Sequence, residues 1–262
     1  MRALNGPATI HALATAALDA GMRLPEFASS LLSNERREYE PVYNGTSEWR
    51  ILPVVDHADD PARLLVSGTG LTHRRSADQR QSMHAADTTP TDSLRMYQLG
   101  VDGGKPEQGR IGNAPEWFYK GSGTRLRGHN ETLVVSSYAE DGGEEPEIAG
   151  VYLIDRQGVP RRLGLTTGNE FSDHVLEQRN YLYLAASKLS NSAIGPELVL
   201  DPGRPGDLHV HYFGADAFSF GAGIRLETGD VMRVQFEGFG RPLRNPILVD
   251  RSPARLVEVV AG

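Results

Sequence analysis

Residues 140–154, EDGGEEPEIAGVYLI, decide the interpretation of this chain, because a dense acidic run leads directly into an apolar segment. Five carboxylates fall within residues 140–147, and the last two, Glu145 and Glu147, stand where the following residues predict a strand. Residues two apart on a strand share one face, so these two acids are expected to point the same way, about 7 Å apart along the strand. The sequence therefore predicts two acids that enter the interior together.

Two like charges this close repel each other and raise each other's pKa unless a cation lies between them. Hard divalent cations such as Mg²⁺ or Mn²⁺ take oxygen ligands of this kind. The third ligand would be Glu170 in LTTGNEFSDH, at the end of the next predicted strand, with Asp173 and His174 close enough to support the ligands. The alternative is a solvated acidic turn, which composition alone favours because most acidic runs are solvated.

The composition is typical of a globular protein. The chain has 262 residues, 39% of them hydrophobic, which allows one large domain with a small appendage. A net charge of -7 argues against a nucleic-acid partner, because phosphate binding requires a concentrated basic face. There is no run of eighteen apolar residues, so no membrane span is expected. The absence of cysteine removes thiolate chemistry and fits a cytoplasmic protein.

The order of patterns along the chain predicts an α+β, mostly β fold. Residues 8–34 are expected to be helical, with Pro25 between two helices or opening the second. EWRILPVV is expected to be a short strand, and residues 74–99 are polar and compatible with helix. From residue 100 onward short predicted strands recur between turns, among them IAGVYLID, RRLGLTTG, YLYLAAS, LHVHYFG and ARLVEVV. We therefore expect a small helical N-terminal region, 1–60, followed by a larger domain, 61–262.

Other side chains could carry chemistry. Lys188 follows the apolar segment YLYLAAS, where a lysine could hold a substrate carboxylate or an oxyanion, although a solvent-exposed lysine is the alternative. His73 and His84 flank a polar, arginine-rich stretch and could belong to a mobile lid that supplies a general base. An ordinary surface helix is the alternative that the residues alone favour. Lys120 follows three aromatic residues in PEWFYKG, and its role stays open.

Seven stretches, taken in order, resemble the fumarylacetoacetate hydrolase family and cover most of residues 50–250. They are PEWFYKG, EEPEIAGVYLI, GLTTGNEFSDH, YLYLAASKLSNSAIGPEL, RPGDLHVHYFG, LETGDV and GFGRPLRNPI. The sequences EDGGEEPEIAG, GNEFSDH and PEWFYKG are most similar to the arabinonate-dehydratase-like branch of the family. A single stretch would be a weak signal, but seven in the family's order are specific.

This resemblance implies a fold and a site. The fold would be a mixed β-roll, or distorted barrel, in a homodimer. Mg²⁺ or Mn²⁺ would lie between Glu145, Glu147 and Glu170 and bind a small 2-oxo acid. Lys188 would hold or protonate the substrate's oxygen, and His73 or His84 would be the mobile base.

The implied activity passes through an enolate of the 2-oxo acid, and two reactions share that enolate. The first is dehydration of a 2-keto-3-deoxy sugar acid, which the similarity to the arabinonate-dehydratase-like branch favours. The second is hydrolysis of a C–C bond in a diketo acid. A module that binds a sugar acid without turning it over is the alternative from another class.

The chain departs from the family pattern at four places. Glu170 stands where most members carry Asp, and residues 68–73, GTGLTH, alter the element that supplies a His–Glu dyad. Gly214-Ala215 replaces the usual Gly-Thr. A few dozen family residues have no counterpart near Leu200 to Pro202. Such a deletion would open the barrel and expose strand edges, which favours the binding module.

Overall fold

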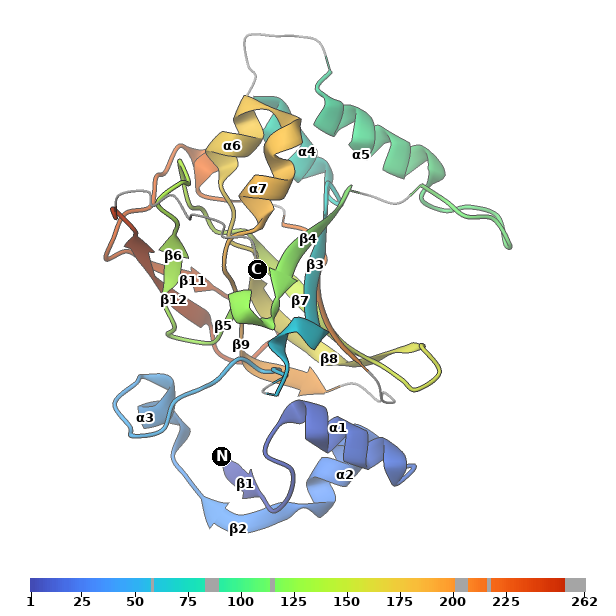
Figure 1. The fold of residues 1–262 in the computed structure, drawn as a ribbon, viewed down its shortest axis with the longest axis vertical. Coiled ribbons are helices and arrows are strands. Elements are labelled where there is room, and N and C mark those ends of the chain that lie inside the picture. The colour runs from blue at the N-terminus through green and yellow to red at the C-terminus, as the bar shows by residue number, and fades with distance from the viewer. Residues whose placement is uncertain (58, 83–89, 114–115, 201–206, 216–217, 253–262) are drawn as a thin grey trace, which may run out of the picture.

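The computed structural model describes residues 1–262 except 58, 83–89, 114–115, 201–206, 216–217 and 253–262 (Figure 1). Its helices are α1 (Ile10–Asp19), α2 (Leu24–Ser30), α3 (Tyr39–Tyr43), α4 (Arg74–Ser82), α5 (Asp92–Gly103), α6 (His174–Arg179) and α7 (Leu184–Lys188). Short 3₁₀ helices are η1 (Pro61–Arg63), η2 (Gly123–Arg125), η3 (Tyr181–Tyr183) and η4 (Phe220–Ala222). No helix in the described ranges is long and apolar enough to cross a membrane.

The strands form three sheets. A small N-terminal sheet pairs β1 (Arg2–Leu4) with β2 (Leu32–Arg36). The main sheet has the order β4 (Glu116–Ser122), β3 (Leu64–Gly70), β10 (Asp207–Tyr212), β7 (Pro146–Ile154), β8 (Pro160–Asn169), β9 (Ser192–Leu200) and β5 (Leu126–Arg127). The third sheet has the order β11 (Val231–Val234), β12 (Leu243–Val249) and β6 (Leu133–Val135). The predicted α+β, mostly β class is confirmed.

The main sheet is strongly curled. Its two edge strands, β4 and β5, follow one another in the chain and are joined by the three residues of η2. Seven strands laid flat would separate these edges by about 29 Å. Three residues span about 11 Å at most, so the sheet must bend until its edges approach each other. No ladder joins β4 to β5 in the described part of the chain, so the sheet is an open curl and not a closed barrel.

The interior of the curl explains the direction of β7. Along this strand Ala149, Val151 and Leu153 are buried in the main apolar cluster, whereas Tyr152 and Ile154 on the opposite face are partly exposed. The strand's period of two places Glu147 on the same face as Ala149. The acid that opens β7 therefore points inward because the strand's apolar residues do.

Helices α1 and α2 pack on this same cluster, and α1 to α3 lie at one end of the molecule, with α4 to α7 at the other end (Figure 1). Pro25 opens the second helix, as one of the two predictions had it. The helical prediction for residues 8–34 is wrong at its end, because Leu32 begins β2, which pairs with β1. Pairing with a distant strand outweighs the local propensity there.

Two strand predictions are wrong. Residues 48–55 form no strand in the structure, and Trp49 and Leu52 are exposed, because Pro53 cannot donate to a ladder. The segment YLYLAAS forms η3 and α7, since Leu182 and Tyr183 are exposed and the alanines favour helix. The predicted strand ARLVEVV lies outside the described residues, and so do residues 201–206, where family residues are expected to have no counterpart.

Candidate metal centre

The three acids singled out from the sequence lie together in the curl. Each offers a carboxylate oxygen, and these oxygens all lie within 4.8 Å of one another. Glu145 is 7% exposed, Glu147 1% and Glu170 0%. The centre is therefore a buried set of three carboxylates, and the alternative of a solvated turn is wrong for these residues.

Strand register brings the acids together. In the antiparallel pair of β7 and β8, Pro146 lies opposite Asn169, and the backbone N–H of Glu170 donates to the carbonyl of Glu145 at 2.9 Å. Glu145 and Glu170 thus extend the ladder by one more pair at the same end. Glu147 lies two residues further along β7 on the face of Glu145, so one end of one strand pair supplies all three side chains.

Two buried lysines face these acids. Lys188, at the end of α7, places Nζ 2.6 Å from Glu145 Oε1 and 2.7 Å from Glu170 Oε2. Lys120, from β4, forms an ion pair with Glu170 Oε1 and donates to the backbone carbonyl of Phe171. Ser172 Oγ, at 3.1 Å from Lys188 Nζ, adds a further partner. The structure places Lys188 beside the acids at the end of a helix and not at the end of a strand, and its role in catalysis stays a prediction.

His174 and Asp173 have different roles in this arrangement. His174 Nε2 donates to Glu145 Oε1 at 3.1 Å and so helps to fix the orientation of this carboxylate. The His174 ring stacks on Phe218 with a centroid distance of 4.6 Å. Asp173 instead caps α6, because its carboxylate accepts from the N–H groups of Leu176 at 3.0 Å and Glu140 at 2.8 Å. Asp173 therefore fixes the helix and the acidic loop that surround the centre.

The backbone at Gly214 holds the third carboxylate. Its N–H donates to Glu147 Oε2 at 2.7 Å, and the hydroxyl of Thr72 donates to the carbonyl of the preceding Phe213 at 2.8 Å. His73 follows Thr72 directly and is exposed at the start of α4. The structure therefore brings His73 to the border of the centre but not among the carboxylates, and His84 lies outside the described residues.

Burial dominates the electrostatics. It raises the pKa of Glu147 well above its usual range, and the charges of Glu170 and Glu145 raise it further. Burial also raises the pKa of Glu170, with the charge of Glu145 acting in the same direction and the lysines opposing it. The pKa of Lys120 is lowered by burial against the opposing attraction of Glu170.

The pKa of His174 results from opposing effects. Burial lowers it, but the hydrogen bond and charge of Glu145 outweigh burial and raise it overall. His174 Nδ1 is buried with no hydrogen-bond partner, which is consistent with Nε2 being the nitrogen that acts as donor.

The donor set fits a hard divalent cation. Three buried carboxylates offer only oxygen atoms, the ligand type that Mg²⁺ and Mn²⁺ prefer. The raised pKa values of Glu147 and Glu170 show that these charges are costly where they lie, and a doubly charged ion would relieve that cost. Glu145, Glu147 and Glu170 are therefore able to hold such an ion.

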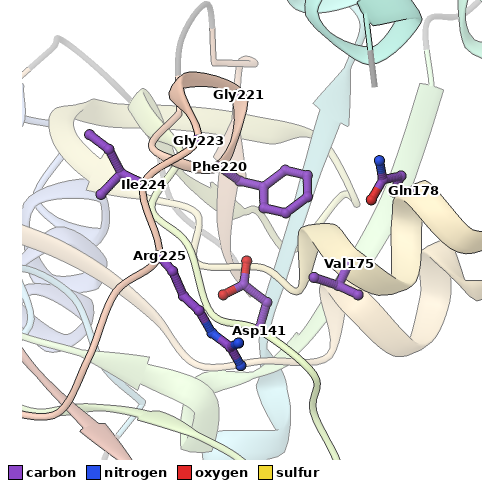
Figure 2. Close-up of a pocket in the computed structure, with 8 residues that line it drawn as sticks. All are labelled: Asp141, Val175, Gln178, Phe220, Gly221, Gly223, Ile224 and Arg225. Atoms are coloured by element: carbon purple, nitrogen blue, oxygen red, sulfur yellow. The ribbon is translucent and has the colours of Figure 1, made fainter. Parts of the chain in front are cut away.

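A hollow of about 470 Å³ lies beside this centre (Figure 2). Its lining is formed by Asp141, Val175, Gln178, Phe220, Gly221, Gly223, Ile224 and Arg225. None of the three carboxylates lines it. The ring of Phe220 stacks on His174 with a centroid distance of 5.8 Å, and His174 in turn contacts Glu145. Phe220 and His174 thus lie between the hollow and Glu145.

Comparisons with known proteins find the fold of this curled sheet in solved structures. The chain shares its fold with 2-keto-3-deoxyarabinonate dehydratase, which confirms the resemblance to the arabinonate-dehydratase-like proteins seen in the sequence. The chain is 39% identical over 87 residues to 2-dehydro-3-deoxy-D-arabinonate dehydratase of Saccharolobus solfataricus, a match that spans 32% of this chain and 28% of the relative. No family model matches the chain.

Two solved structures share the fold over most of their length. A hexagonal crystal form of 2-keto-3-deoxyarabinonate dehydratase has a TM-score of 0.60 at 20% identity and covers 84% of each chain. The 2-keto-3-deoxy-D-arabinonate dehydratase complexed with magnesium and 2,5-dioxopentanoate also has a TM-score of 0.60 at 20% identity, with 83% of each chain covered. At this identity the likeness demonstrates the fold alone.

Proposed function

We propose that this chain is an enzyme that uses a divalent cation to dehydrate a 2-keto-3-deoxy sugar acid. The observation that carries the proposal is the buried set of Glu145, Glu147 and Glu170 with Lys188 between two of them. The dehydratase names of the relatives, and the magnesium bound in one of them, support the same reading. This makes the chain a lyase of carbohydrate catabolism.

Glu145, Glu147 and Glu170 would hold Mg²⁺ or Mn²⁺. When bound, such a cation supplies Lewis-acid stabilisation of the negative charge that develops on the keto oxygen of a 2-oxo acid. His174 would keep Glu145 oriented, and the N–H of Gly214 would keep Glu147 oriented. The protein would thus orient two of the three ligands through hydrogen bonds of its own.

The chain's own groups would move the protons. Lys188 would hold the substrate's carboxylate or keto oxygen and keep a proton available there, because its ammonium group is buried beside the centre. A base from the segment after β3, His73 or His84, would remove a proton from C3. The hydroxyl at C4 would leave with a proton, so that the net change is the loss of one water.

The compound bound in the solved relative agrees with this balance. Removing one water from a five-carbon 2-keto-3-deoxy acid leaves a C3=C4 double bond. Tautomerisation, in which C5 and its hydroxyl each lose a hydrogen and C3 and C4 each gain one, then gives 2,5-dioxopentanoate, the compound seen with magnesium in that relative. We therefore propose a 2-keto-3-deoxypentonate as the first substrate to test.

The experiment is to incubate the protein with Mg²⁺ and either a 2-keto-3-deoxypentonate or an acylpyruvate, and to follow both by proton NMR. We expect 2,5-dioxopentanoate from the first and no cleavage of the second. Cleavage of the acylpyruvate alone would identify a C–C hydrolase of diketo acids. Binding of the sugar acid without turnover would identify a binding module. Glu147→Gln should abolish metal-dependent turnover, and a fully active variant would contradict the site.

Four further features of the protein belong to the same proposal. We infer a β-roll for the curled sheet, a domain boundary near residue 60, a homodimer and a cytoplasmic location. The short link between β4 and β5 supports the roll, since it requires the sheet edges to approach. Light scattering after gel filtration tests the homodimer, for which we expect twice the mass of one chain.

A further inference from the structure

The ammonium group of Lys188 bridges two of the three proposed cation ligands. Its Nζ lies 2.6 Å from Glu145 Oε1 and 2.7 Å from Glu170 Oε2, both within the range of strong charge-assisted hydrogen bonds. The side chain of Lys188 is fully buried and that of Glu170 is too. Lys188 is thus a built-in counter-ion of the carboxylates, placed there by the end of α7.

Lys188 occupies oxygens of two of the three carboxylates that would hold a divalent cation. Glu145 Oε1 already accepts from His174 as well as from Lys188. Both oxygens of Glu170 are engaged, Oε1 by Lys120 and by Ser172 at 2.9 Å, and Oε2 by Lys188. A cation such as Mg²⁺ binds carboxylate oxygens directly at about 2.1 Å. An ammonium group and a doubly charged ion on the same buried oxygens repel each other strongly, because little water screens them.

We propose that Lys188 competes with the divalent cation for Glu145 and Glu170, so that cation binding releases the lysine from these two acids. This inference rests on the cation site of the proposed function and deepens it. Lys188 would become available to a substrate only in the cation-loaded protein. The order of events is then set by the site: the cation binds first, and the lysine is freed for the 2-oxo acid as a consequence.

The surroundings of Lys188 support such a release. Its Nζ lies 4.7 Å from the centre of the Phe118 ring, a distance at which an aromatic face attracts a cation. Glu177 Oε1 at 3.3 Å and Ser172 Oγ at 3.1 Å offer further partners outside the set of three acids. The ammonium group can therefore leave Glu145 and Glu170 and remain charged and partnered in the interior.

Lys120 is anchored differently. It contacts one of the three acids, Glu170, and also donates to the backbone carbonyl of Phe171. A backbone carbonyl does not move away when a cation binds, so Lys120 is held in place. The competition is therefore assigned to Lys188 and not to both lysines.

The test is calorimetric titration of Mg²⁺ and of Mn²⁺ into chelator-treated protein. Lys188→Met removes the charge and keeps the length of the side chain, so we expect it to bind the cation about tenfold more tightly than wild type, or tighter still. Lys188→Arg keeps the charge and can bind two carboxylates at once, so we expect equal or weaker binding. Met binding no more tightly than wild type, or Arg binding more tightly than Met, would overturn the proposal.

Thermal unfolding gives a second readout that needs no titration. In chelator, Lys188→Met should melt below wild type because two buried acids lose their counter-ion, and Mg²⁺ should raise its melting temperature more than that of wild type. An equal rise in both proteins would count against competition. If wild type itself binds neither cation, the proposed function fails; if wild type binds and Met shows no gain, only the competition fails.

Discussion

Gly214→Ala should damage both the fold and the cation site. Gly214 has φ +104, a backbone conformation that residues with a Cβ rarely adopt, and an added Cβ would lie 2.0 Å from Thr72 Oγ1 and 3.1 Å from the carbonyl oxygen of Thr69. Its N–H donates to Glu147 Oε2 at 2.7 Å, so any shift that relieves the clash also moves this donor.

The cost can be worked from these contacts. Strained backbone costs about 1–3 kcal/mol. Leaving a buried polar group without its hydrogen bond costs about 1–3 kcal/mol, and the carboxyl group of Glu147 would be left without this one. Together they predict a loss of about 2–6 kcal/mol in the free energy of unfolding. Because Gly214 orients Glu147, affinity for Mg²⁺ should also fall about tenfold or more.

Gly223→Ala is the matched control. Gly223 has φ +73, and nothing lies within 4 Å of an added Cβ, so this variant suffers the backbone cost alone, about 1–2 kcal/mol. Urea unfolding of the three proteins measures stability, and calorimetry measures Mg²⁺ affinity. The reasoning is refuted if the two variants lose equal stability, or if Gly214→Ala binds Mg²⁺ as wild type does.

The remaining predictions concern three side chains. The raised pKa of Glu147 means that chelated wild type should lose stability as pH rises above 4.5. Urea midpoints should therefore fall as the pH rises from about 5 in wild type and fall less in Glu147→Gln, and an equal decline in both proteins would contradict this. His174→Ala should weaken Mg²⁺ binding about tenfold, whereas His174→Gln, which keeps a donor, should weaken it less; calorimetry showing equal losses would exclude the positioning role. Asn245→Ala should lower the free energy of unfolding in urea by about 2–4 kcal/mol, because this buried amide donates to two backbone carbonyls at 3.0 and 2.9 Å. A loss below about 1 kcal/mol, the contribution of a single hydrogen bond, would count against this prediction.

The three acids could be predicted from the sequence because they depend on strand geometry alone. Alternation along β7 places Glu147 with Ala149 and Val151, and the same parity applies to Glu145. Glu170 follows because antiparallel neighbours bring the start of one strand to the end of the next. These are short-range rules that need no knowledge of the rest of the fold.

The lysines were harder to predict, since their placement depends on tertiary packing. The segment before Lys188 is apolar enough for a strand, but Asn180 caps η3 by accepting from the N–H of Leu182 at 2.9 Å, and a helix follows. Lys120 lies on a strand whose usual pattern is reversed, with Trp117 and Tyr119 exposed and the lysine buried. Residues 116–120 alternate with a period of two, but the buried face carries the charged residues Glu116 and Lys120 and the exposed face carries Trp117 and Tyr119.

The contact between Gly214 and Glu147 had no signal in the sequence. It joins residues 67 positions apart through a backbone N–H, which any residue other than proline possesses. The same holds for Phe118, whose ring lies beside the ammonium group of Lys188. Such contacts arise only once the sheet has curled and brought β4, β7 and the residues after β10 to one end.

Crystals grown with MnCl₂ offer the most direct measurement, because Mn²⁺ scatters anomalously and can be located independently of the protein atoms. The account predicts an anomalous peak within about 2.2 Å of one oxygen from each of Glu145, Glu147 and Glu170, and loss of that peak in Glu147→Gln. Strong diffraction with no peak between these three side chains, or a peak that persists in the variant, would contradict the claim that they form a cation site.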